Sequence, residues 1–287
     1  MYSDTKDVVG AGLGVNVLKT LVNRAYDRAK RWAGGVLILQ SCLFIAGVMA
    51  VFWPVWTLNY PWLAVPVALF GAWVAARAAT FKGMAESAKR QHEYVEGFGV
   101  KPSGSQLADL RQDLQKELSP DAVELLGLGI TYASEESYGP RRALENLCES
   151  AWFTKHLARR CVYWVAGAFI VTFVIGISML LYSAAKASGT EAGAAAAKSV
   201  AATFTFLISV GSIRSWVSYA KLSAKAEKSD ADATRMLGTA NPSMFEVQRL
   251  LMEYQVARAS APLIPTWIWR IHRNAMNEDY KLRTSKA

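Results

Sequence analysis

An uncharged stretch from Ala33 to Ala76 is the feature that most constrains how this chain can fold. A membrane-spanning helix needs about 20 apolar residues, so the stretch is too long for one span and long enough for two. Two prolines and an asparagine between residues 54 and 61 supply a turn, and tryptophan and tyrosine side chains flank it, as they do at a bilayer interface. The sequence therefore predicts a hairpin of two transmembrane helices, over residues 34–55 and 61–79.

A second apolar block predicts another hairpin. Residues 162–185 are uncharged and long enough for a third span, whereas the apolar stretch 199–213 is short and lies between Lys198 and Arg214. The alanines just before Lys198 extend it to spanning length if the lysine reaches outward to the membrane surface. Basic residues are scarce in the short loops of the two hairpins and frequent elsewhere, which places both termini and the middle segment in the cytoplasm.

The charged segments also carry apolar residues at helical spacing. Pro120 and Pro242 stand at helix starts, and Pro262 and Pro265 separate two helices near the end of the chain. We therefore expect an all-α polytopic membrane protein with four transmembrane helices in two hairpins and a helical cytoplasmic module. The predicted parts are an amphipathic cytoplasmic helix over 1–32, the first transmembrane hairpin over 33–79, a helical cytoplasmic insert over 80–160, the second transmembrane hairpin over 161–217 and a helical cytoplasmic tail over 218–287.

The net charge of +9 is compatible with nucleic acid, an acidic partner or a membrane surface. Lysines and arginines gather beside the apolar blocks without forming a long basic run, so we interpret the charge as setting topology and expect no DNA or RNA partner. The cysteines and histidines lack metal-ligand spacing, and no phosphate-binding loop or hydrolase motif occurs. Acidic residues of the insert are interpreted as solvated helix faces. We expect no catalytic residue, no metal and no cofactor, and hence a protein that is not an enzyme.

The tail carries a recognisable order of residue types: glutamines and an arginine on one helix, a proline break, aromatic residues, then an arginine and a glutamate. The residues are Gln248, Gln255, Arg258, Pro262, Pro265, Trp267, Trp269, Arg273 and Glu278. The first helix adds a Tyr26-x-x-Ala29-Lys30 pattern, and the loop before Arg141 leads to Trp152. Together with the two hairpins, this layout resembles the SMODS-associated four-transmembrane effector family over nearly the whole chain.

The resemblance implies a bacterial anti-phage effector of the inner membrane. Proteins of this family are encoded beside nucleotidyltransferases that make cyclic oligonucleotides upon infection. They are thought to sense the nucleotide and to permeabilise the membrane. The expected partners are therefore a cyclic nucleotide second messenger, the lipid bilayer and further copies of the chain, since four spans are few for a pore within one subunit.

Arginines and aromatic residues of the insert and the tail are the expected ligand contacts, because arginine binds phosphate bidentately and aromatic rings stack on bases. These residues are Tyr138, Arg141, Arg142, Arg258, Trp267, Trp269, Arg270 and Arg273. The alternative is that they form structural ion pairs and membrane-surface anchors. Lys198 and Arg214, at the ends of the fourth span, are the expected pore or gating residues, and ordinary packing within one subunit is the alternative.

Two other function classes stay open. A membrane-anchored signalling or scaffold protein would use the spans only to tether a helical interaction module. A small transporter is less favoured, because the predicted spans lack the acidic or histidine residues that couple ions.

Overall fold

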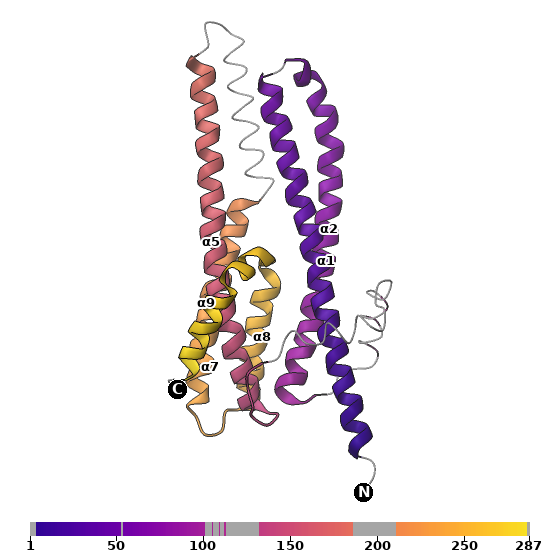
Figure 1. The fold of residues 1–287 in the computed structure, drawn as a ribbon, viewed down its shortest axis with the longest axis vertical. Helices are drawn as coiled ribbons and strands as arrows, with labels where there is room; N and C mark the ends of the chain where they lie inside the picture. The colour runs from indigo at the N-terminus through magenta and orange to yellow at the C-terminus, as the bar shows by residue number, and fades with distance from the viewer. Residues whose placement is uncertain are drawn as a thin grey trace. The chain divides into compact units, whose positions relative to one another are not determined.

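The fold is described by a computed structural model that covers residues 4–52, 54–100, 132–185 and 211–285, together with Ser105, Asp109 and Gln112. Within these residues all the regular structure is helical. The helices are α1 (Asp4–Phe52), α2 (Pro54–Phe98), α5 (Pro140–Ala185), α7 (Ser212–Leu237), α8 (Met244–Ser260) and α9 (Thr266–Thr284) (Figure 1). The all-α prediction is confirmed for the described part of the chain.

α2 is longer than the sequence predicts, whereas α1 runs without a break from the predicted amphipathic helix into the predicted first span, as expected. The predicted turn between residues 55 and 61 is wrong, because α2 begins at Pro54 and Pro61 lies inside it. Proline suits the first helical position, where its missing N–H would have no intrahelical partner. Gly99 ends α2 with a φ of 68°, a left-handed conformation that glycine adopts without strain.

α5 joins two parts that the sequence separates, the predicted helix over 141–160 and the predicted third span over 162–185. Among the described residues, one helical stretch, Pro140–Ser178, is long and apolar enough to cross a membrane. Only 11% of its most apolar part is buried, so a protein core does not account for its apolar character. The predicted fourth span lies almost wholly outside the described residues, and the four-span topology stays a prediction.

The chain divides into two compact units. The first, which we call the charged unit, comprises Met1–Lys30, Ala79–Ala158 and Lys221–Ala287. The second, the apolar unit, comprises Arg31–Ala78 and Arg159–Ala220. α1, α2, α5 and α7 each cross one of these boundaries, so continuous helices contribute residues to both units.

Two large apolar clusters lie within the described part of the charged unit, and both follow the three-to-four-residue spacing of helix faces. In one cluster α1 packs against α2, through Leu18, Leu21, Val22 and Ala25 and through Ala85, Ala88 and Val95. In the other cluster, α5 packs against α7 and α8. The residues are Ala143, Leu144, Leu147, Cys148 and Ala151 of α5, Ala226 and Ala233 of α7, and Val247, Leu250, Leu251 and Tyr254 of α8. These clusters hold the helices that position the site described below.

The apolar unit has the opposite character, because its large apolar side chains point outward. Trp32 of α1 and Trp73 of α2 meet edge to face, with their ring centroids 5.5 Å apart. Many others are more than half exposed: Leu37, Ile38 and Ile45 in α1, Val65, Leu69 and Phe70 in α2, and Ile170, Val171, Val174 and Leu181 in α5. So many exposed large apolar side chains in one unit are typical of contact with a membrane or with another protein.

Candidate ligand-binding cavity

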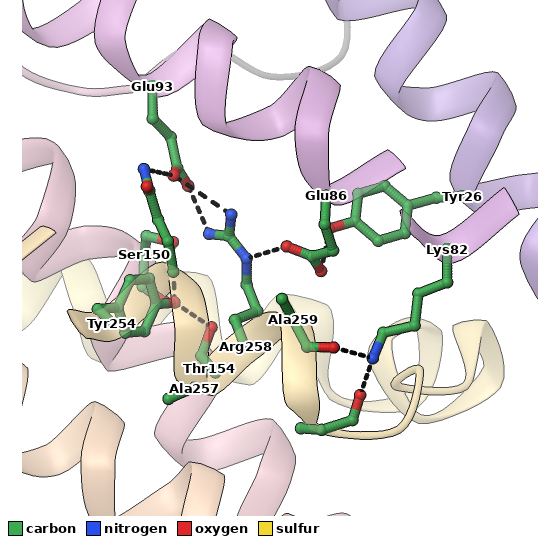
Figure 2. A network of polar contacts seen from close by, with 12 residues as sticks. Tyr26, Lys82, Glu86, Glu93, Ser150, Thr154, Tyr254, Ala257, Arg258 and Ala259 are labelled. Atoms are coloured by element: carbon green, nitrogen blue, oxygen red, sulfur yellow. Dashed lines mark hydrogen bonds and ion pairs between the residues drawn. The ribbon is translucent and has the colours of Figure 1, made fainter. Parts of the chain in front are cut away.

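Arg258, in the last turn of α8, is bound by two carboxylates of α2. Its Nε donates to Glu86 at 2.9 Å, and its terminal nitrogens donate to Glu93 at 2.5 and 3.2 Å (Figure 2). Gln255, one turn earlier in α8, donates to Glu93 at 2.8 Å. Glu86 and Glu93 lie on one face of α2 because they are two helical turns apart. All four side chains are buried, and we call them the arginine clamp.

Other side chains connect the clamp to its surroundings (Figure 2). Tyr26 of α1 donates its hydroxyl proton to Glu86 at 2.6 Å. Lys82 of α2 donates to two carbonyl oxygens at the end of α8, those of Ala259 and Ala261, where a cation also favours the helix dipole. The Tyr254 hydroxyl is hydrogen-bonded to that of Thr154 in α5 at 2.7 Å. α1, α2, α5 and α8 are thus held together by polar contacts as well as by the apolar core.

A cavity of about 700 Å³ lies beside the clamp, within the charged unit. Its volume is in the range of small-molecule sites. Its cationic residues are Lys30, Lys82, Lys89, Arg258 and Arg273, and its acidic residues are Asp27, Glu86 and Glu149. The aromatic side chains in its wall are Tyr26, Tyr132, Phe153 and Trp269. Cations and flat rings in one cavity are the two features that an anionic aromatic ligand requires.

The electrostatics of the cavity are dominated by burial and by the arginine. Burial and the nearby Arg258 lower the pKa of Lys89 to about 8, although the carboxylates of Glu93 and Glu86 act to raise it. Burial also lowers the pKa of Lys30 and of Lys82. Glu93 behaves in the opposite way: burial would raise its pKa, but Arg258 and Lys89 hold it below its usual value. The clamp is therefore an ion pair, while the lysines sit in an environment that disfavours their charge.

The structure separates the predicted ligand contacts into two groups. Arg258, Trp269 and Arg273 line the cavity. Trp267 and Arg270, in the first turns of α9, are exposed and do not line it.

Tyr138, Arg141 and Arg142 lie elsewhere, around the start of α5. Arg142 donates to the carbonyl oxygen of Glu96 at 2.7 Å and lies over the Tyr138 ring, 4.8 Å from its centroid. Arg141 is 3.4 Å from Glu136. Arg142 also lies 3.4 Å from the Glu96 carboxylate, so both arginines make ion pairs within the protein, and their predicted role in ligand binding stays a prediction. Of the two predicted gating residues, Arg214 is exposed in the first turn of α7 and Lys198 lies outside the described residues.

The sequence analysis missed the acidic half of the clamp and the lysines beside it. Lys82, Glu86, Lys89 and Glu93 recur at spacings of four, three and four residues, which places alternating charges on one face of α2. The interpretation of the acidic residues as solvated faces is wrong for Glu86 and Glu93, which are 4% and 5% exposed. The pattern that could have predicted this burial is the alternation of lysine and glutamate at helical spacing, with the small residues Ala85 and Ala88 between them. Tyr132 stands near the start of a polar loop, where no pattern in the sequence indicates that its side chain lines a cavity.

Within the described residues, no group of three histidine, cysteine or acidic side chains is arranged to hold a metal ion. Comparisons with protein-family models, with curated proteins and with solved structures found no match.

Proposed function

We propose that this chain is a membrane effector of bacterial anti-phage defence, which a cyclic oligonucleotide activates and which permeabilises the inner membrane as an oligomer. In this proposal the apolar unit supplies four spans, both termini are cytoplasmic, and the charged unit is the sensor. The single observation that supports it most is the cavity, because it combines cations with aromatic rings in the unit that would face the cytoplasm.

Helix continuity supports the link between sensing and the membrane. Glu86 of α2 belongs to the clamp, Tyr26 of α1 donates to it, and Thr154 of α5 is hydrogen-bonded to the neighbouring Tyr254. Each of these helices continues into the apolar unit without a break. A ligand that changes the contacts of the charged unit would therefore act on the same helices that carry the exposed apolar side chains.

Dye leakage from liposomes tests the proposal. The purified full-length protein is reconstituted into vesicles of bacterial lipid composition, and a panel of cyclic di- and trinucleotides is added, with the linear nucleotides as controls. We expect leakage with one member of the panel and none without ligand. Lys198→Gln and Arg214→Gln should alter the leakage rate while leaving nucleotide binding unchanged. Absence of ligand-dependent leakage across the panel contradicts a gated pore.

One observation favours a second candidate, a membrane-anchored scaffold. Phe245, Met252 and Val256 are 72%, 55% and 63% exposed, and their spacing places them on one face of α8. They line a groove with Lys225 and Arg249, as a helical interaction module would. Expression in cells separates the two functions, because a triggered pore former depolarises the membrane and a scaffold does not.

A further inference from the structure

Not all the charges around the cavity have partners. Arg258 is taken by the clamp, and Lys82 is taken by the carbonyl oxygens at the end of α8. By contrast, Lys30, Lys89 and Arg273 make no hydrogen bond and no ion pair with any residue that the structure describes, although all three line the cavity. They come from α1, α2 and α9, so their charges converge on the cavity from separate helices.

The acidic residues of the cavity do not balance these cations. Glu86 is bound by Arg258 and Tyr26, and Glu149 accepts a hydrogen bond from the backbone N–H of Ala133. Asp27 is the remaining carboxylate in the wall, one helical turn before Lys30 on α1. Neither Asp27 nor Glu149 makes an ion pair with a residue that the structure describes, so three cations without ion pairs face two carboxylates, and the remaining positive charge is one that an anion would neutralise.

The aromatic residues narrow the class of anion. Trp269 packs edge to face against Phe153, with their ring centroids 5.7 Å apart, and both line the cavity. Tyr132 is enclosed on another part of the wall, where burial raises its pKa well above the usual range. A small inorganic anion would use the cations but not the rings, whereas a planar base can stack on an indole held in this way.

We infer that Lys30, Lys89 and Arg273 are the anion contacts of this cavity, and that its ligand is a phosphate ester carrying a planar ring that stacks on Trp269. The inference rests on the proposed function and deepens it, because it names the contact residues and the ligand chemistry of the sensing unit. Lys89 is the central contact, because it stands between Glu86 and Glu93 on the same face of α2 and lines the cavity, while both carboxylates are bound by Arg258.

Ligand affinity should depend on pH through Lys89. The charged groups that act on it are Arg258 of α8, Glu93 and Glu86 of α2 and Lys30 of α1, and the charge of Lys89 in turn lowers the pKa of His92 of α2. A bound phosphate adds negative charge and favours the ammonium form. Because the pKa of Lys89 is about 8 in the empty protein, affinity should be highest below that pH and fall as the pH rises through it.

The test is equilibrium binding to the full-length protein in nanodiscs of zwitterionic lipid. The probes are cyclic di-AMP, AMP and inorganic pyrophosphate, with adenosine as the uncharged control. We expect the nucleotides to bind and adenosine not to bind. Lys89→Met should weaken nucleotide binding at least about tenfold, the loss of one charge-assisted contact. Arg90→Met, which removes the adjacent and exposed charge of the same helix, should change it less than about twofold.

Two further variants separate the parts of the inference. Trp269→Ala should weaken binding of AMP more than binding of pyrophosphate. Equal losses for the two probes would overturn the stacked ring. If phosphatidylglycerol nanodiscs compete with the nucleotides, the phosphate ester is a lipid headgroup, and the planar-ring assignment is overturned. Wild-type affinity in Lys30→Met, Lys89→Met and Arg273→Met alike would overturn the whole site.

The two proposals fail in different ways. Lys89-dependent binding without leakage would reject the pore and retain the site. Nucleotide-triggered leakage that is unchanged in Lys89→Met would retain the effector and reject the site.

Discussion

Replacing Arg258 by methionine tests whether the arginine clamp holds the charged unit together. Methionine keeps most of the length of the side chain and removes its charge. The arginine and both carboxylates it binds are at most 8% exposed, so the substitution leaves two buried carboxylates without their cation. Removing one partner of a buried ion pair costs about 3–5 kcal/mol. In the variant Glu86 keeps its hydrogen bond from Tyr26, and Glu93 keeps its hydrogen bond from Gln255. We therefore expect a loss of stability near the lower end of that range, about 3 kcal/mol.

A loss of this size is measurable in detergent by following tryptophan fluorescence during heating. About 3 kcal/mol should lower the unfolding midpoint by about 6–12 °C for a unit of this size. Arg90→Met is the matched control, because Arg90 is an exposed arginine of α2, and its midpoint should stay within about 2 °C of the wild type.

The pH dependence identifies the cause of the loss. In the wild type the folded-state pKa of Glu93 is lowered, so its contribution to stability is present above its unfolded value and is lost as the pH falls through the folded value. In Arg258→Met the cation is absent and burial alone acts, so the pKa of Glu93 rises. The deficit of the variant should therefore shrink between about pH 7.5 and pH 5 as the carboxyl group takes up a proton. A deficit that is equal at both pH values, or a midpoint shift under about 2 °C, would refute the reasoning.

Three other substitutions test single features of the charged unit by the same measurement. Lys89→Met should stabilise the protein near neutral pH by about 3 kcal/mol, because the lowering of the Lys89 pKa from 10.5 to about 8 corresponds to a free-energy cost of about that size for keeping the charge in the folded protein. The stability of the wild type should therefore rise between about pH 8 and 10.5, and the variant should lack this rise. Gly97→Ala should destabilise by about 1–3 kcal/mol, because the added Cβ would lie 2.9 Å from the Cβ and 3.1 Å from the Cα of Ala143. Gly83→Ala, which meets nothing within 4 Å, should instead stabilise α2 by up to about 1 kcal/mol. Equal effects of the two glycine substitutions would contradict the close packing of α2 on α5.

Sequence reasoning works well where local signals set the boundaries of a helix. Pro242 and Ser243 directly precede α8, and Pro262 and Pro265 separate α8 from α9, as expected. It fails where it cuts a helix at a change of polarity, as in α2 and α5. Backbone hydrogen bonding within a helix does not depend on whether the side chains face water or lipid, so a change of polarity along the sequence does not by itself end a helix.

The site is harder to predict because its charges depend on tertiary partners. Arg258 is identifiable in the sequence as a residue with a special role, but its partners are 165 and 172 residues away in the chain. Without those partners a glutamate on a helix has no visible reason to be buried. The expectation that Arg258 binds phosphate directly follows from its residue type alone, and the clamp changes that expectation, because its donors already bind carboxylates.

Some cations of the cavity are already bound by groups of the protein and others are not, and this difference decides how a ligand would act on the helices. An anion that took Arg258 would have to leave two buried carboxylates uncompensated, at the cost worked out above. An anion that binds Lys89 leaves the clamp intact and removes charge repulsion, because Arg258 and Lys30 both disfavour the charge of Lys89. Binding should therefore tighten the contacts between α2 and α8. Under the proposed function, the signal that enters the apolar unit is then a stiffening of continuous helices, and amide hydrogen exchange in α2 and α8 should slow upon nucleotide binding. Faster exchange in α8 with ligand bound would indicate instead that the anion opens the clamp.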